Sequence, residues 1–162
     1  VKEWINDFLS TDGKLVVFAI HRFVIDELMK EFKDIAVKVD GSVTGVNRDK
    51  AVQAFQNDDK IRLFIGNINA AGVGLTLTVA SNVVFIELPW SPAILEQAED
   101  RCHRIGQKDT VNIYYLLGVD TIEEKIAKML DSKRKILDTV LDGKKTTPES
   151  LLSELIKSYD KR

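Results

Sequence analysis

The hydrophobic positions of this chain fall into five short runs, most of them rich in β-branched residues. Runs of roughly 4–8 such residues between turn signals are typical of buried strands. The predicted strands are residues 15–20, 35–39, 61–65, 82–87 and 111–117. Between them, apolar residues recur at helical spacing over 22–32, 47–56 and 92–105, with a short turn near Ala70. This alternation predicts the α/β class: an open parallel sheet with helices on both faces.

The two ends of the chain have a different pattern. Residues 1–10 form an amphipathic helical pattern, and residues 121–141 form a long one with a single apolar face. We expect the long helix to brace the sheet from outside, and Pro148 to begin a last short helix. The predicted division is therefore a sheet lobe over 1–118, a C-terminal brace helix over 119–141, and a linker with a short helix over 142–162.

Composition limits the possible functions. The chain has 162 residues, enough for one domain, and its 23 Lys and Arg against 25 Asp and Glu give a net charge of -2. Any DNA contact must therefore be local. The single cysteine, Cys102, cannot form an internal disulfide and favours an intracellular location, nuclear in a eukaryote or cytoplasmic in a bacterium. No apolar run approaches the ~20 residues that cross a membrane, and no Cys/His set has the spacing of a metal site.

The predicted helix over 92–105 contains the main candidate chemistry. Ser91 and Pro92 are a helix-start signal, and Gly106 is a stop signal. At 100° per residue, one stripe is apolar and is expected to be buried: Ile94, Ala98, Cys102 and Ile105. The stripe beside it is polar: Gln97, Arg101 and Arg104. These arginines either make surface ion pairs, such as Asp100 with Arg104, or present charged forks to a polyphosphate.

The stretch "QAEDRCHRIGQ", residues 97–107, resembles motif VI of the superfamily-two helicases in its Swi/Snf form. Other stretches resemble that family in the expected order. "LVVFAIHRFVIDEL" is similar to motif IV, "GNINAAGVGLTLTVASNVVFIELPWSP" to motif V with its extension, and "TIEEKIAKMLDSKRKIL" to the trailing brace helix. The resemblance covers about residues 15–118 and implies a RecA-like lobe. "GLTLT", Glu87 and "IELPWSP" are similar to the distal annealing-helicase and fork-remodelling branch.

The resemblance implies roles for individual residues. Arg101 and Arg104 would be arginine fingers that contact ATP phosphates, Gln97 would support them, and Gly72 and Gly74 would lie in a nucleotide-binding loop. The implied DNA contacts are Asn69, Trp90, Ser42, Arg48, Asn67, His21 and Arg22. Two of these have alternatives: Trp90 could instead be a packing anchor, and Asn67 stands where the family often has serine.

A complete ATPase of this type needs a phosphate loop and an acidic metal-binding motif, and neither occurs in the sequence. We therefore expect the second lobe of a motor whose first lobe holds most of the ATP and Mg²⁺. The expected partners are double-stranded or forked DNA and the first RecA-like lobe of the same polypeptide, without a membrane. The isolated chain is expected to be an inactive monomer. Two alternatives remain open: an RNA helicase lobe, and a catalytically silent DNA-annealing or adaptor module.

Overall fold

Five parallel strands form one sheet in the order β2-β3-β1-β4-β5. This computed structural model describes residues 1–11, 13–71, 77–102, 111–118 and 121–142, without the side chains of 71, 100–102 and 134–142. The strands are β1 (Leu15–Ala19), β2 (Ala36–Val39), β3 (Leu63–Asn67), β4 (Asn82–Phe85) and β5 (Asn112–Tyr115). Each strand matches a predicted strand to within two residues at either end. The parallel α/β class is confirmed.

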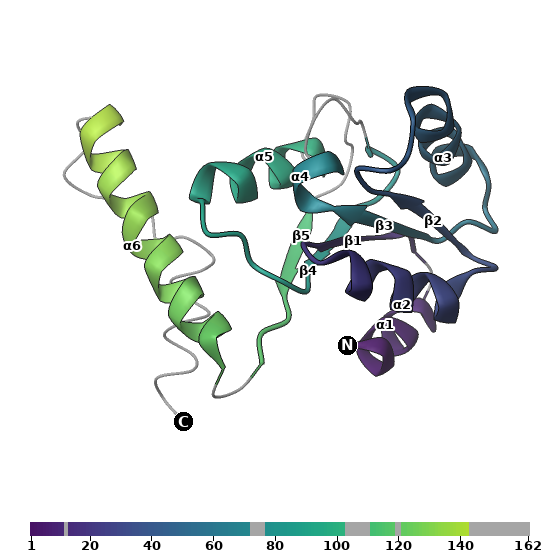
Figure 1. Ribbon diagram of the computed structural model, residues 1–162, viewed down its shortest axis with the longest axis horizontal. Coiled ribbons are helices and arrows are strands. Elements are labelled where there is room, and N and C mark those ends of the chain that lie inside the picture. The colour runs from purple at the N-terminus through teal and green to yellow at the C-terminus, as the bar shows by residue number, and fades with distance from the viewer. Residues whose placement is uncertain (12, 72–76, 103–110, 119–120, 143–162) are drawn as a thin grey trace.

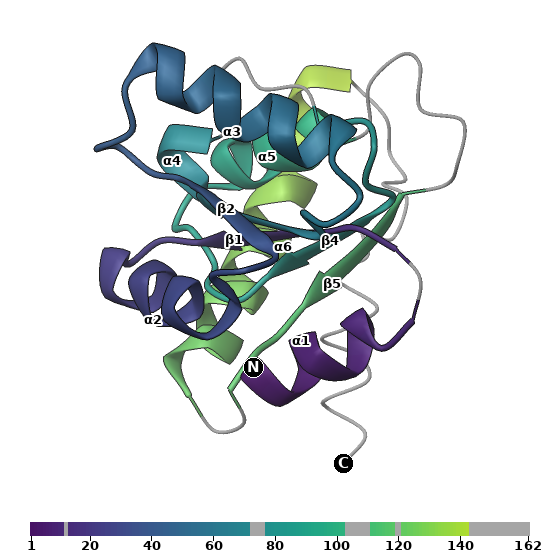
Figure 2. The same ribbon diagram turned by 90° about the vertical axis from the view of Figure 1, so that its right-hand side faces the viewer.

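Helices cover both faces of the sheet (Figures 1 and 2). They are α1 (Lys2–Leu9), α2 (Arg22–Phe32), α3 (Gly45–Asn57), α4 (Ile68–Ala71), α5 (Pro92–Cys102) and α6 (Ile122–Asp142). Helices α1 and α2 pack on one face, where Ile5 and Ile25 join the core that includes Val17. Helices α3 and α5 pack on the other, where Phe55 and Leu95 join a second core cluster.

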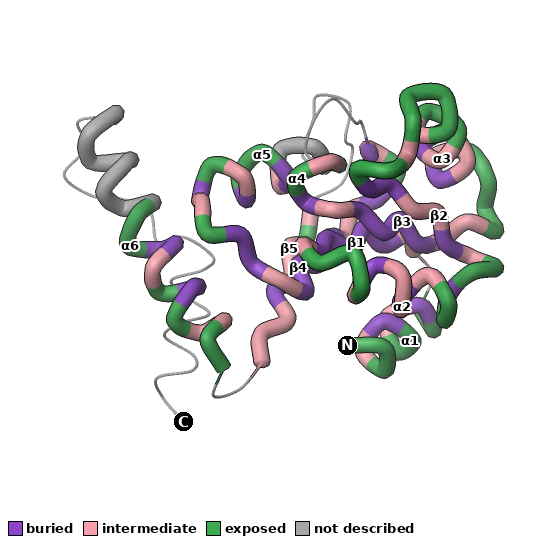
Figure 3. The backbone as a smooth tube through the Cα atoms, viewed as in Figure 1, coloured by how far each residue is buried: buried purple, intermediate pink, exposed green. Residues whose placement is uncertain are grey.

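The central strands are buried on both faces, which is why their sequences are continuously apolar rather than alternating. All five residues of β1 are fully buried, and β3 is buried from Leu63 to Gly66 (Figure 3). Even and odd positions of a strand point to opposite faces. Val16 and Phe18 accordingly belong to the core under α3 and α5, and Val17 belongs to the core under α1 and α2.

Three aromatic rings form a row across the face covered by α5. The strand register places Phe18 beside Phe85, and Phe85 beside Tyr115. The ring centroids of Phe18 and Phe85 are 5.3 Å apart, and those of Phe85 and Tyr115 are 5.4 Å apart, with both pairs stacked. Stacked aromatic pairs add stability beyond the area they bury. This aromatic row therefore joins β1, β4 and β5 into one packed layer.

Helix α6 packs against α5 at the side of the sheet (Figure 1). Its buried residues Ile126, Ala127 and Leu130 belong to the same core cluster as Leu95 and Ala98 of α5. The helix coincides with the predicted long helix over 121–141. The division into lobe, brace and linker remains a prediction, and residues 143–162 lie outside the described part of the chain. None of the helices in that described part is long and apolar enough to span a bilayer.

Strand β3 begins at Leu63, two residues later than the sequence pattern predicts. Arg62, directly before it, makes side-chain contacts with the end of α1 and the segment that follows. Its guanidinium donates hydrogen bonds to the carbonyls of Leu9, at 2.9 Å, and Gly13, at 3.1 Å. It also donates to the carbonyl of Thr11. A planar guanidinium with several N–H donors suits this arrangement of carbonyls at a helix C-terminus. Arg62 thus ties the end of α1 to the start of β3.

Candidate nucleic-acid interface

Five of the seven residues predicted to contact DNA lie at or shortly after the carboxyl ends of three neighbouring strands. Because the strands are parallel, their carboxyl ends meet at one edge of the sheet. There the segments after β1, β2 and β3 line a hollow of about 540 Å³. The lining residues are Arg22, Asp40, Gly41, Ser42, Asn67, Asn69 and Ala70. We call this the carboxyl-edge hollow. Four of the seven predicted DNA contacts line it.

Asp40 forms the floor of the hollow after β2. Its side chain is only 4% exposed, and its Oδ1 accepts hydrogen bonds from the backbone N–H of Ser42, at 2.8 Å, and from the Ser42 hydroxyl, at 2.5 Å. The ammonium of Lys38 lies 3.3 Å from Oδ2. Burial by itself raises the pKa of the Asp40 carboxyl, but the Ser42 hydrogen bonds and Lys38 together hold it below its ordinary value of 3.8.

Replacing Asp40 by asparagine should destabilise the fold in a pH-dependent way. A depressed pKa in the folded state means that folding favours the ionised carboxylate, so its contribution is present above about pH 4 and is lost as the pH falls further. We expect Asp40→Asn to cost about 1–2 kcal/mol at neutral pH, with the difference from the parent shrinking as the pH falls below about 4. Urea unfolding across this range measures it, with the exposed Asp34→Asn as control. A stability difference between the parent and Asp40→Asn that does not change with pH would contradict the lowered pKa of the Asp40 carboxyl.

The side chains of two predicted DNA contacts form hydrogen bonds to the backbone of the protein itself. The side-chain amide of Asn67 donates to the carbonyl of Ile20 at 2.6 Å, and its oxygen accepts from the backbone N–H of Asn69 at 3.0 Å. Arg48, which is half-buried on α3, donates to the carbonyl of Ala70 at 2.9 Å. These side chains therefore shape the turn that begins α4, so they support the wall of the hollow rather than extend into solvent.

Glu87, just after β4, fixes the turn between β1 and α2. One carboxylate oxygen accepts the backbone N–H groups of Ile20, at 2.7 Å, and His21, at 2.8 Å. The other lies 2.6 Å from Nδ1 of His21. His21 is thus paired, although its side chain is 74% exposed. The sequence pattern pointed to Glu87 only as a branch marker, because the contact joins residues 66 positions apart.

Besides the exposed Ser42 and His21, three predicted DNA contacts present substantial exposed surface. The Arg22 side chain is 68% exposed, with its Nε 3.8 Å from Asp26 and 4.0 Å from Asp40. Asn69 is exposed at the start of α4, and Trp90 is 61% exposed after β4. The tryptophan is therefore not a packing anchor, although its backbone carbonyl accepts a hydrogen bond from Lys133 of α6 at 3.3 Å.

Helix α5 follows this segment and contains Arg101. Its buried contacts come from Leu95 and Ala98, each 0% exposed, whereas Ile94 is only half-buried. The predicted buried stripe is confirmed at Ala98, but Leu95 rather than Ile94 is the fully buried residue one turn earlier, because Leu95 and Ala98 are spaced i, i+3 on the face that meets the sheet. The side chains of Cys102 and Ile105 lie outside the described part of the structure. Gln97 is exposed. The Arg101 side chain lies outside the described part of the structure.

The remaining nucleotide-site predictions also lie outside the described residues. They are Arg104, Gly72 and Gly74. Their backbone positions and contacts are therefore not part of the interface described above.

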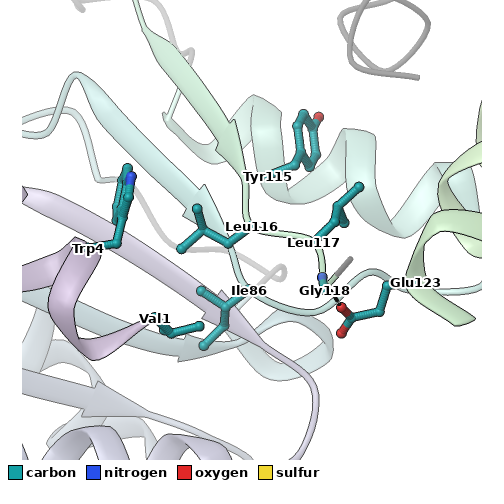
Figure 4. Close-up of a pocket in the computed structure, with 8 residues that line it drawn as sticks. All are labelled: Val1, Trp4, Ile86, Tyr115, Leu116, Leu117, Gly118 and Glu123. Atoms are coloured by element: carbon teal, nitrogen blue, oxygen red, sulfur yellow. Dashed lines mark hydrogen bonds between the residues drawn. The ribbon is translucent and has the colours of Figure 1, made fainter. Parts of the chain in front are cut away.

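A second hollow, of about 460 Å³, lies between α1 and the segment that joins β5 to α6 (Figure 4). Trp4, Ile86 and Leu116 line it with apolar surface. At its rim, the carboxylate of Glu123 accepts the backbone N–H of Gly118 at 2.8 Å. Among the residues that the structure describes, none of the predicted DNA contacts lines this hollow.

Comparison with known proteins decides the family. Residues 1–106 match the family model described as the helicase conserved C-terminal domain. The chain belongs to this family. The helicase C-terminal domain is 42% identical over 149 residues to the DNA annealing helicase and endonuclease ZRANB3 of Homo sapiens, covering 90% of this chain and 14% of that protein. A crystal structure of the C-terminal part of the Fun30 ATPase domain superposes with a TM-score of 0.73 and 28% identity, covering 98% of this chain and 53% of that one.

A third relative supports the same assignment. The helicase C-terminal domain is 38% identical over 164 residues to the SWI/SNF-related matrix-associated actin-dependent regulator of chromatin subfamily A-like protein 1 of Xenopus tropicalis, covering 99% of this chain. The resemblance to Swi/Snf enzymes and the RecA-like fold class are thereby confirmed. The chain spans only 14% and 17% of the length of these two curated relatives. The roles of individual residues stay predictions.

Proposed function

We propose that this helicase C-terminal domain is the second motor lobe of an ATP-dependent translocase on double-stranded DNA. In this proposal Arg101 and Arg104, supported by Gln97, act on ATP held by a first lobe, with Gly72 and Gly74 beside the nucleotide. The carboxyl-edge hollow contacts the tracked DNA strand. An intracellular location, nuclear in a eukaryote, goes with this function, and the isolated chain is proposed to be an inactive monomer.

The observation that carries the proposal is the convergence of predicted DNA residues at one edge of the sheet. Arg22, Ser42, Asn67 and Asn69 come from three segments that are distant in sequence, yet they line one hollow. Arginine, hydroxyl and amide groups are the side chains that position nucleic-acid phosphates. Two of the relatives are a DNA annealing helicase and a regulator of chromatin, which favours DNA over RNA as the partner.

The residue types on this chain fit one part of a nucleotide site. Guanidinium groups match phosphate oxygens, but they cannot ligate Mg²⁺. Within the part of the chain that the structure describes, no group of three His, Cys, Asp or Glu side chains is placed to hold a metal ion. We therefore assign Mg²⁺ and most of the ATP contacts to the first lobe. When bound, Mg²⁺ neutralises charge between the β- and γ-phosphates.

The fold suggests how the two activities are joined. Helix α5, which contains Arg101, begins two residues after the exposed Trp90. A movement that brings Arg101 of α5 toward ATP would therefore also shift Trp90 and the carboxyl-edge hollow against DNA. An exposed indole can stack or wedge against nucleic acid, while Arg22 and Asn69 hold the backbone. Repeated closing and opening of two lobes would convert hydrolysis into steps along one strand.

The direct test is ATP hydrolysis by the full-length protein with duplex DNA, with duplex RNA and without nucleic acid. Stimulation by duplex DNA well above that by duplex RNA is the expected result. Equal or greater stimulation by RNA would favour the RNA helicase alternative. No stimulated turnover at all would favour the silent annealing module.

Arg22→Gln should weaken binding to duplex DNA without regard to its sequence. The change removes one exposed positive charge at the carboxyl-edge hollow, so the salt dependence of the affinity should fall by about one phosphate contact. Fluorescence anisotropy over a salt series on the full-length protein measures this. Lys33→Gln is the matched control, because it removes a positive charge from the far end of α2, at the opposite edge of the sheet. Equal losses in both variants would mean that only net charge matters.

A further inference from the structure

We propose that Tyr115 is a positioning residue for Arg101 of α5, acting through its hydrogen bond to Glu99. The inference rests on the proposed function, because it assumes that α5 presents Arg101 to ATP. The Tyr115 hydroxyl on β5 donates a hydrogen bond to the carboxylate of Glu99 on α5. Glu99 lies two residues before Arg101 on the same helix.

The Tyr115 ring is held firmly in the core, so its hydroxyl can fix the position of a helix. Its residue is 8% exposed, and its ring stacks on Phe85 with an interplanar angle of 17°. Phe85 in turn stacks on Phe18 of the central strand. The hydroxyl is therefore fixed by the aromatic row that spans β1, β4 and β5. Figure 4 shows Tyr115 pointing to the α5 side while its neighbour Leu116 points to the other side.

The apolar contacts of α5 constrain rotation of the helix about its own axis only weakly. Leu95 and Ala98 bury the helix against the sheet, but contact between smooth apolar side chains is not directional. A hydrogen bond is directional and weakens steeply when its angle changes. The bond to Glu99 therefore limits rotation of α5 about its own axis, close to the end of the helix that contains Arg101.

A small rotation has a large effect at the end of a long side chain. The tip of an arginine lies about 9 Å from its helix axis, so a rotation of about 10° moves a guanidinium by about 1.5 Å. A misplacement of about 1 Å at a reacting centre can cost about 100-fold in rate. Loss of the Tyr115 hydroxyl should therefore lower turnover far more than it changes the fold.

The experiment compares Tyr115→Phe with Tyr114→Phe in the full-length protein. Both variants lose one hydroxyl from β5, and both keep the ring. Tyr114 points to the opposite face of the sheet, where its ring meets Trp4 and Phe8 edge-on. We expect Tyr115→Phe to lower the DNA-stimulated kcat by about 10- to 100-fold, with little change in the KM for ATP or in duplex affinity. Tyr114→Phe should keep the parent kcat.

A double variant tests the route through Glu99. If the hydroxyl acts through this carboxylate, Tyr115→Phe combined with Glu99→Ala should lose no more turnover than Glu99→Ala alone. Additive losses would overturn the inference, as would equal losses in the two tyrosine variants. The Arg101→Lys variant distinguishes a failure of the positioning role from a failure of the proposed function. Low turnover of Arg101→Lys with a normal kcat for Tyr115→Phe overturns the positioning role alone, and normal turnover of Arg101→Lys overturns the proposed function with it.

Discussion

Replacing Arg101 by lysine in the full-length protein is expected to lower DNA-stimulated ATP turnover by about 10³-fold or more, with little loss of duplex affinity. Lysine keeps the positive charge but lacks the planar fork that binds two phosphate oxygens at once. Arginine fingers typically contribute ~10³ to 10⁵ in turnover, or about 4–7 kcal/mol, whereas a surface ion pair contributes a few tenths. Steady-state hydrolysis and DNA binding of the same preparations measure both quantities.

The matched control is Arg62→Lys, the same change at the residue directly before β3. Arg62 donates to the carbonyls at the end of α1, and lysine cannot bond all three in one geometry. This variant should therefore lose about 1–3 kcal/mol of stability while keeping turnover at temperatures where it is folded. If Arg101→Lys instead behaves like Arg62→Lys, then Arg101 belongs to a helix surface and the proposed mechanism is wrong.

Phe85→Ala is expected to cost about 3–5 kcal/mol of unfolding free energy, a large part of the stability of a domain of this size. The side chain is fully buried at the middle of the aromatic row, so its removal leaves a cavity and breaks two stacked pairs. The rings on either side are held by separate strands, which limits how far they can close the gap. Chemical denaturation followed by circular dichroism measures the change.

Phe23→Ala provides the comparison for the phenylalanine prediction. Phe23 is 74% exposed on the first turn of α2, so the same atoms are removed without a buried cavity. Its effect should lie within about 0.5 kcal/mol of the parent. Similar losses in the two variants would show that the row at Phe85 is not tightly packed.

The fold could be predicted from the sequence because the apolar residues of its helices and strands recur at regular intervals. Helix α2 occupies the predicted residues 22–32, and β1 differs from its predicted strand by one residue. Both elements are read from apolar patterns that extend over several residues. The contacts of Arg62, directly before β3, could not be predicted in this way, because its side chain meets carbonyls about fifty positions earlier.

The candidate site could be predicted less completely, and the reason lies in hydrogen bonds. Residue type alone identified Arg22 and Asn69, which are exposed at the carboxyl-edge hollow. It could not distinguish them from Arg48 and Asn67, whose side chains bond to the backbone of the same turn. It also gave no sign that Glu87 fixes the turn after β1, since such long-range partners leave no period in the sequence.

The strand order has a consequence for how the chain folds during synthesis. The first two strands, β1 and β2, are not neighbours, because β3 lies between them. A nascent chain that ends before Leu63 therefore contains two apolar strands and no partner for either. The insertion of β3 supplies both ladders at once, and β4 then completes the second side of β1. Pairing of β1 and β2 therefore waits until β3 has emerged, and during that interval the apolar segment Leu15–Ala19 is exposed to aggregation.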